Sequence, residues 1–222
     1  MCGIFGITTS QNSNYSKKNL INSFNLLAKL SEVRGKDSSG LCLFNNKNNI
    51  IDIIKGPISI TKLMDNKVSK KKVSDSILNS KDFNLLFGHA RLVTNGSQLN
   101  DYNNQPVFKD NVISVHNGII TNSESVWKKN SELNKNYDID TEILLSLVRK
   151  EITLGNSIED SVSNSVRKLE GTISVAIAFS DFKKIILATN NGSLYILSNY
   201  KDILFFASEK NILEKLKKKN NL

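Results

Sequence analysis

The chain begins with the stretch Met1-Cys2-Gly3-Ile4-Phe5-Gly6-Ile7, in which a cysteine directly follows the initiator methionine. A small second residue permits removal of Met1, and Cys2 would then carry both a thiol and a free α-amine. The thiol has an ordinary pKa of about 8.5 and the amine one of about 7.7–8.0, so the amine can accept the thiol proton near neutral pH. One residue then supplies a nucleophile and its general base. The alternative is that Cys2 is a small apolar residue opening an edge strand.

The composition is that of an ordinary globular protein. The 222 residues are 39% hydrophobic and 23% charged, as in typical soluble domains. No apolar run approaches the ~20 residues that a membrane-spanning helix needs, and no signal peptide is recognisable at the N-terminus. We therefore expect a cytoplasmic protein without membrane contact. The two cysteines, Cys2 and Cys42, are too few for a disulfide framework, and two histidines without a Cys-x-x-Cys pair predict neither zinc nor another cofactor.

The net charge of +9 raises the possibility of a nucleic-acid partner. The lysines, however, form local runs at residues 70–72 and 215–219. No helix-turn-helix, zinc-finger or RNP signature accompanies them. The pattern favours solvated lysines that could meet an acidic partner surface, and it predicts no nucleic-acid binding.

Hydrophobic periodicity predicts a chain that alternates groups of strands with groups of helices. Strands are expected at residues 3–8, 41–44, 50–54, 85–94, 112–115, 172–180, 184–190, 193–198 and 202–206. Helices are expected at residues 20–34, within 58–79, at 123–133, from 140, from 157, and from 208. This order cannot build an all-parallel array and predicts an α+β fold of antiparallel sheets with helices outside. The absence of repeats and linkers predicts a single domain over residues 1–222.

Two polar features stand at expected strand ends, where a rigid scaffold can hold functional groups. The guanidinium of Arg91 needs a carboxylate, which could belong to a ligand or to an internal ion pair. The dipeptide Asn117-Gly118 offers a side-chain amide and an unshielded backbone N–H, two donors suited to a developing oxyanion. The alternative for this dipeptide is a hairpin turn, although no clear return strand follows it.

Three further residues have open interpretations. Asp140 stands at an expected helix N-cap, where it would stay ionised and could either accept from a ligand ammonium or cap the helix. His89 and His116 could form a Cys–His dyad with Cys2. Both lie in apolar strand patterns, which favours buried core histidines.

Together these motifs resemble the class II glutamine amidotransferase domain, an N-terminal-nucleophile (Ntn) hydrolase found in glucosamine-phosphate synthase, amidophosphoribosyltransferase and asparagine synthetase. The resemblance covers essentially the whole chain in order. It rests on Met1-Cys2-Gly3-Ile4-Phe5-Gly6, Arg34-Gly35-x-Asp37-Ser38-Ser39-Gly40, Gly88-His89-x-Arg91-x-x-Thr94-x-Gly96, His116-Asn117-Gly118-Ile119-Ile120-x-Asn122, Asp140-Thr141-Glu142 and Phe206-Ala207-Ser208-Glu209.

The resemblance implies a four-layer αββα sandwich and a glutaminase reaction. Cys2, freed of Met1, would attack the side-chain amide of L-glutamine, and the resulting thioester would be hydrolysed to glutamate. The resemblance assigns the oxyanion to Asn117 and the N–H of Gly118. The remaining residues that it implicates are Arg91 for the α-carboxylate, Asp140 for the α-ammonium, Thr94 as a pocket residue, and Arg34 in support of the nucleophile.

Two departures from the family bear on the reaction as a whole. Leu92 and Asn95 stand where the glucosamine-phosphate synthases carry an aromatic residue and a histidine, so the motifs mix features of two subfamilies. The sequence also shows no synthase domain, which predicts a separate acceptor subunit that receives the ammonia. The alternatives are a free-standing glutaminase, an Ntn amidase acting on another amide, and a non-catalytic scaffold.

Overall fold

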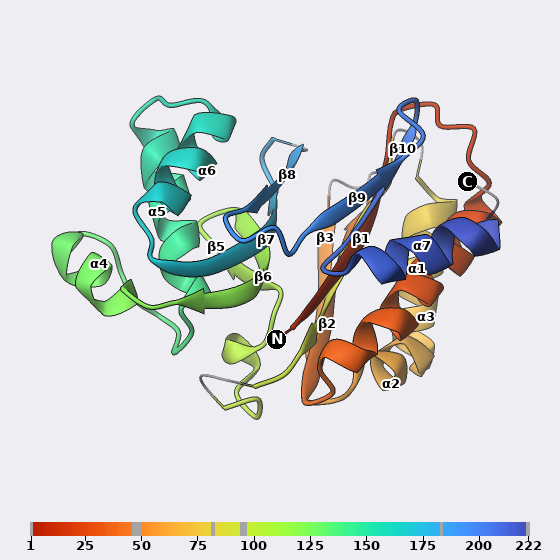
Figure 1. Ribbon diagram of the computed structural model, residues 1–222, viewed down its shortest axis with the longest axis horizontal. Coiled ribbons are helices and arrows are strands. Elements are labelled where there is room, and N and C mark those ends of the chain that lie inside the picture. The colour runs from red at the N-terminus through yellow and green to blue at the C-terminus, as the bar shows by residue number, and fades with distance from the viewer. Residues whose placement is uncertain (1, 46–49, 81–82, 94–96, 183, 221–222) are drawn as a thin grey trace.

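The computed structural model describes residues 2–45, 50–80, 83–93, 97–182 and 184–220. Two antiparallel sheets form its centre (Figure 1). The six-stranded sheet has the order β3 (Ile50–Gly56), β2 (Ser38–Asn45), β4 (Leu85–Arg91), β1 (Gly3–Thr9), β10 (Ile203–Ala207), β9 (Tyr195–Ser198). The four-stranded sheet has the order β5 (Val107–Lys109), β6 (Val112–Ile120), β7 (Gly171–Phe179), β8 (Lys184–Thr189).

Helices cover the outer face of each sheet (Figure 1). The six-stranded sheet is covered by α1 (Lys17–Ser31), α2 (Ile60–Asp65), α3 (Lys67–Leu78) and α7 (Lys210–Asn220). The four-stranded sheet is covered by α4 (Ser123–Lys129), α5 (Thr141–Thr153) and α6 (Ile158–Arg167). Short 3₁₀ turns, η1 (Glu32–Arg34) and η2 (Asp101–Asn103), complete the described elements. None of the helices in the described ranges combines the length and apolar character that crossing a membrane would need.

The apolar core has three layers, because alternate residues of each strand face opposite sides of its sheet. One cluster joins the six-stranded sheet to its helices and includes Phe5 and Leu86. A second joins the four-stranded sheet to α5 and includes Val112. The third fills the space between the sheets, with Ile4 and Phe87 from one sheet and Val115 from the other among its members. The expected αββα sandwich is therefore confirmed.

Two strands are longer than the sequence pattern predicts, and both extensions bring polar motif residues into a sheet. β2 begins at Ser38, so residues 38–40 pair with β4 instead of forming a loop. β6 runs to Ile120, so Asn117 and Gly118 pair with β7 rather than follow the strand. The hydrophobic pattern missed these residues because it counts only apolar positions, whereas backbone pairing continues through polar ones.

Two predicted helix ends also differ. Gly35 follows η1 in an extended conformation (φ −177°), so it does not form the left-handed cap expected of a C-terminal glycine. A Cβ on Gly35 would lie 2.2 Å from the carbonyl carbon of Arg91, and the close approach of these two backbones explains the glycine. α4 ends at Lys129 instead of 133, where the side chain of Asn130 donates to the carbonyl of Val126 at 2.8 Å and caps the helix.

Candidate active site

The side chains of Cys2 and Asn117 point from opposite sides into the layer between the two sheets. Cys2 lies two residues before Ile4, and Asn117 lies two residues after Val115; both Ile4 and Val115 belong to the cluster between the sheets. The period-two alternation of strands therefore directs both side chains into this layer. β1 and β6 contact each other across it.

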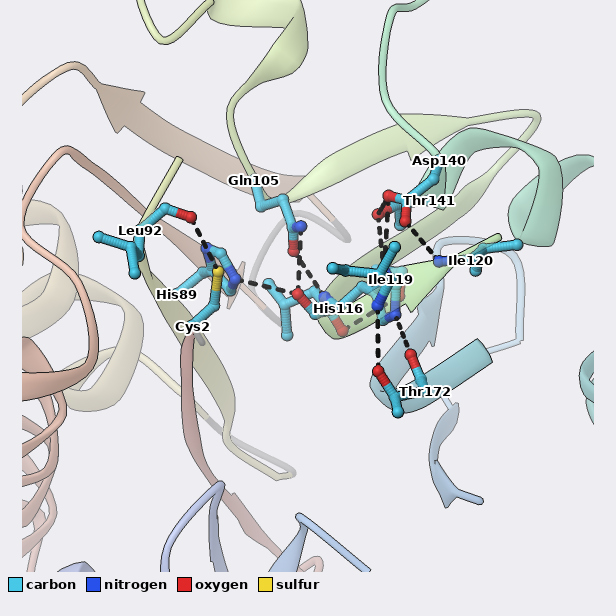
Figure 2. A network of polar contacts seen from close by, with 12 residues as sticks. Cys2, His89, Leu92, Gln105, His116, Ile119, Ile120, Asp140, Thr141 and Thr172 are labelled. Atoms are coloured by element: carbon cyan, nitrogen blue, oxygen red, sulfur yellow. Dashed lines mark hydrogen bonds and ion pairs between the residues drawn. The ribbon is translucent and has the colours of Figure 1, made fainter. Parts of the chain in front are cut away.

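The Cys2 thiol is partly buried beside the end of β4. Its Sγ donates to the carbonyl oxygen of Leu92 at 3.6 Å (Figure 2). Burial raises the pKa of the thiol, and the positive charges of Arg91 and Arg34 oppose this only in part. The thiol is therefore protonated at neutral pH and needs a base before it can act as a nucleophile.

Arg91 ends β4 and its side chain shares the inter-sheet face with that of Phe87, four residues earlier. The residue is only 5% exposed, and Nη1 donates to Oδ1 of Asn104 at 3.1 Å. Burial lowers the pKa of the guanidinium, while the charges of Cys2, Asp140 and Asp37 raise it. Arg91 therefore lies near enough to Cys2 and Asp140 to interact with their charges, although the three residues are far apart in the sequence.

Asp140 precedes α5 but does not cap it. No backbone N–H of the helix donates to its side chain, and Oδ2 instead accepts the backbone N–H of Ile120 at 2.7 Å. The helix-cap interpretation is therefore wrong. The contact holds the carboxylate at the end of β6, two residues beyond Gly118. A pocket of about 320 Å³ opens beside it, between Trp127, Asp138 and Asp140.

Asn117 is buried, and neither its side-chain oxygen nor its side-chain nitrogen has a hydrogen-bond partner among the described residues. A buried polar group left unpaired costs about 1–3 kcal/mol. Gly118 adopts φ +153°, and a Cβ there would lie 1.8 Å from the carbonyl oxygen of Thr172. The hairpin-turn interpretation of Asn117-Gly118 is therefore wrong, because the dipeptide lies within a paired strand.

Arg34 lies beside the chain's second residue. Its Nε donates to the carbonyl oxygen of Cys2 at 3.5 Å, and Nη1 donates to Oε1 of Glu209 at 2.5 Å. Ser208 makes two hydrogen bonds to the adjacent Ile4. Its backbone N–H donates to the carbonyl oxygen of Ile4 at 2.9 Å, and its hydroxyl oxygen accepts the backbone N–H of Ile4 at 3.2 Å. The end of β10 and the 3₁₀ turn after α1 therefore fix the start of β1.

Both histidines are buried and bonded elsewhere than to Cys2. His89 Nε2 lies 3.1 Å from the carbonyl oxygen of His116, whose own Nδ1 lies 3.1 Å from Oγ1 of Thr141. Burial lowers both pKa values, that of His89 to about 3, so both rings are neutral at pH 7. Across the described part of the chain no hydrogen bond joins a histidine to the thiol, which argues against the Cys–His dyad.

One expected residue lies outside the described part of the chain, and two residues near the site were not anticipated from the sequence. Thr94, the expected pocket residue, lies outside the described residues. Asn104 and Gln105 contact Arg91 and His116, yet they belong to an asparagine-rich loop in which carboxamides give no recognisable signal. Over the described ranges, no three His, Cys, Asp or Glu side chains are grouped so that they could hold a metal ion.

Known proteins share this fold. The structure of glutamine phosphoribosylpyrophosphate amidotransferase from B. subtilis, complexed with ADP and GMP, superimposes with a TM-score of 0.69 at 22% identity, over 97% of this chain and 43% of that one. A glutamine aminotransferase class-II domain protein from Silicibacter pomeroyi gives 0.52 at 11% identity, over 92% of this chain and 88% of that one. The fold is that of the class II glutamine amidotransferases.

Sequence comparison identifies the family. The profile of the glutamine amidotransferase domain matches residues 89–215, more than half of the chain. The isomerizing glutamine–fructose-6-phosphate aminotransferase of Buchnera aphidicola subsp. Acyrthosiphon pisum is 32% identical over 216 residues, which cover 94% of this chain and 32% of that enzyme. This chain belongs to the glutamine amidotransferase family. It spans about a third of the length of this relative.

Proposed function

We propose that this chain hydrolyses the side-chain amide of L-glutamine to glutamate and ammonia, with Cys2 as the nucleophile. One observation carries the proposal: the thiol of Cys2, which directly precedes β1 of one sheet, and the unpaired, buried amide of Asn117 in the other sheet face the same inter-sheet layer. An unpaired buried amide is costly in the free protein and gains its partner when a substrate oxygen binds.

In the proposed reaction, the α-amine of Cys2 takes the thiol proton after Met1 has been removed. The thiolate bonds to the amide carbon of glutamine, and the resulting oxyanion accepts from the Asn117 side chain and the Gly118 N–H. The amine passes the proton to the departing nitrogen, so that ammonia leaves a glutamyl thioester. Water then hydrolyses the thioester, releasing glutamate and restoring the thiol.

Arg91 and Asp140 are proposed to bind the two charged groups of the amino acid. Arg91 offers a planar fork for the α-carboxylate, and its burial strengthens a charge-assisted hydrogen bond. The Asp140 carboxylate, fixed by the Ile120 N–H, offers an acceptor for the α-ammonium. Arg34 is proposed to act in support, by holding the carbonyl of Cys2. Thr94 remains a proposed pocket residue by resemblance alone.

The test is glutamate and ammonia release from glutamine by the purified protein. Intact mass must show loss of Met1 in the active form, and a thiol-directed glutamine analogue must label Cys2. Cys2→Ala must abolish release, whereas Cys42→Ala, which removes the other thiol from the core, must retain it. Active protein that keeps Met1 would contradict the mechanism, because the proposed base would then be an amide.

We also propose that the ammonia serves an acceptor enzyme on a separate chain, and that residues 1–222 form one glutaminase domain. The +9 charge supports an acidic docking face on that partner. An antibody to this chain should detect a polypeptide near 24.8 kDa in native extract and co-precipitate an acceptor enzyme. A longer polypeptide that carries both parts would overturn this arrangement but leave the glutaminase proposal intact.

A further inference from the structure

The side chain of Gln105 bonds the backbone of β6 at His116, where the pairing with β5 has already ended. β5 pairs with β6 from Val107 opposite Ser114, and the same register extended by two residues sets Gln105 opposite His116. Gln105 Oε1 accepts the backbone N–H of His116 at 2.5 Å, and its Nε2 donates to the carbonyl oxygen of His116 at 3.2 Å (Figure 2). The carboxamide therefore bonds both peptide groups of the residue that precedes Asn117.

His89 bonds the same carbonyl from the other sheet. Its Nε2 lies 3.1 Å from the carbonyl oxygen of His116 (Figure 2). Because a carbonyl oxygen can only accept, Nε2 carries the proton, and a neutral ring then leaves Nδ1 bare. Nδ1 has no partner among the described residues, so the Nε2 contact is what orients this buried ring.

This contact joins the strands that carry the two halves of the proposed chemistry. His89 stands opposite Ile4 in the β1–β4 pairing, two residues from Cys2. His116 directly precedes the Asn117-Gly118 donors in β6. Apolar packing between sheets is non-directional, whereas donors must be held within about 0.5 Å of the productive geometry, and directional hydrogen bonds supply that constraint.

We propose that Gln105 and His89 are positioning residues that clamp the peptide groups of His116 and so fix the Asn117 and Gly118 donors relative to Cys2. The clamp rests on the proposed glutaminase reaction. It acts on donors that matter chiefly in the transition state, so its loss should lower kcat and leave substrate binding unchanged.

The first test is Gln105→Leu, which nearly preserves volume and removes both bonds. Loss of one oxyanion donor costs about 10²–10³ in rate, so displacement of the donors should lower kcat for glutamine about tenfold or more. The KM should stay within about twofold. Gln11→Leu, at an exposed loop position, is the matched control and should change neither constant. An unchanged kcat in Gln105→Leu, or a rise in KM alone, would overturn the clamp.

Two inhibitors distinguish the proposed positioning role of Gln105 from a purely structural one. With glutamate γ-semialdehyde, Cys2 Sγ bonds to the aldehyde carbon and the thiol proton ends on the aldehyde oxygen, which then occupies the donor site. Glutamate, the product, forms no such tetrahedral adduct. In Gln105→Leu the inhibition constant of the aldehyde should rise about tenfold or more while that of glutamate stays constant. An equal rise for both would indicate general loosening and contradict the proposal.

His89 is tested by rescue. His89→Leu removes the donor, whereas His89→Gln restores an N–H, so His89→Gln should recover most of the kcat that His89→Leu loses. If circular dichroism shows that both variants are folded and their kcat values are equal, His89 is not part of the clamp. If His89→Leu does not fold, Gln105→Leu decides the proposal.

The two proposals can fail separately. A wild-type protein that releases no glutamate overturns the glutaminase function. The clamp is then judged by amide hydrogen exchange at Asn117 and Gly118, which should be faster in Gln105→Leu than in wild type or Gln11→Leu. Unchanged exchange overturns the clamp.

Discussion

Lys109 and Glu142 form an ion pair that is almost completely buried between β5 and α5. The Lys109 Nζ lies 2.5 Å from Glu142 Oε1, and the two side chains are 6% and 0% exposed. Glu142 also accepts the backbone N–H groups of Asn136 and Tyr137 at 2.7 and 2.8 Å. This pair therefore orders the segment that leads to Asp140, the proposed ligand of the substrate ammonium.

Removing the lysine of this pair should destabilise the protein strongly. Lys109→Met leaves a buried carboxylate without its counter-ion, which typically costs about 3–5 kcal/mol. Urea unfolding should show this loss in the free energy of unfolding. The double variant Lys109→Met with Glu142→Gln should recover part of it, because the glutamine is uncharged and still accepts from the backbone. A loss below about 1 kcal/mol in Lys109→Met would show that the pair does not hold this segment.

Arg91 should contribute through its shape as well as its charge. Arg91→Lys keeps the positive charge but cannot form the bidentate fork, so we expect kcat/KM for glutamine to fall about 30-fold or more, mainly through KM. Arg91→Ala should fall further. Steady-state assays with glutamine and with a simple aliphatic amide distinguish a glutaminase from an amidase with another substrate. In an amidase that does not recognise an amino acid, these Arg91 substitutions would lower kcat/KM little with either substrate.

Local patterns predicted antiparallel sheets with helices outside, whereas the four layers and the roles of the polar groups were implied by the resemblance to the family. Alternating apolar residues predicted the strands, and their order excluded a parallel sheet. Cys2, Arg91 and Asn117 were candidates from their positions in the sequence, whereas the local pattern favoured Asp140 as a helix cap and only the resemblance gave it a role in binding. In the structure Arg91 lies near enough to Cys2 and Asp140 to interact with their charges, and Asn117 faces the inter-sheet layer.

The remaining features could not be predicted because they depend on contacts between distant segments. Gln105 bonds His116 only because the β5–β6 register sets these residues opposite each other. Gly35 is required by the backbone of Arg91, and nothing near Gly35 in the sequence indicates that approach. Asp140 satisfies every local criterion for a helix cap, yet the N–H of Ile120 binds it instead.

The Cys2 thiol should react slowly at neutral pH in protein that retains Met1. Burial raises its pKa, so the thiolate fraction at pH 7 is small and alkylation by iodoacetamide should rise about tenfold per pH unit from pH 7 to 9. Mass spectrometry of the alkylated protein measures this rate. Cys42 is buried, and burial raises its pKa far above the ordinary value, so Cys42→Ala should give the same profile. A rate independent of pH between 6 and 8 would mean that the thiol is already ionised.

The buried histidines should make the fold sensitive to mild acid. Burial lowers the pKa of His89 to about 3; the hydrogen bond to the His116 carbonyl opposes this lowering, and the charge of Arg91 adds to it. Above about pH 6.5 the ring is neutral in both folded and unfolded states, so stability does not depend on its titration. Between pH 6.5 and 3 the unfolded chain binds a proton that the folded protein does not, so the free energy of unfolding should fall as the pH falls, by up to about 1.4 kcal/mol per pH unit.

Burial lowers the pKa of His116 as well, so the two rings act in the same direction. Urea unfolding at pH 7.5, 6.0, 5.5 and 5.0 measures the combined slope. His89→Gln removes one titrating group and keeps an N–H donor toward His116, so its stability should fall less steeply over this range than that of wild type. Parallel slopes in the two proteins would show that His89 takes up a proton in the folded state, and would contradict the neutral Nε2–H ring on which the contact between the two sheets depends.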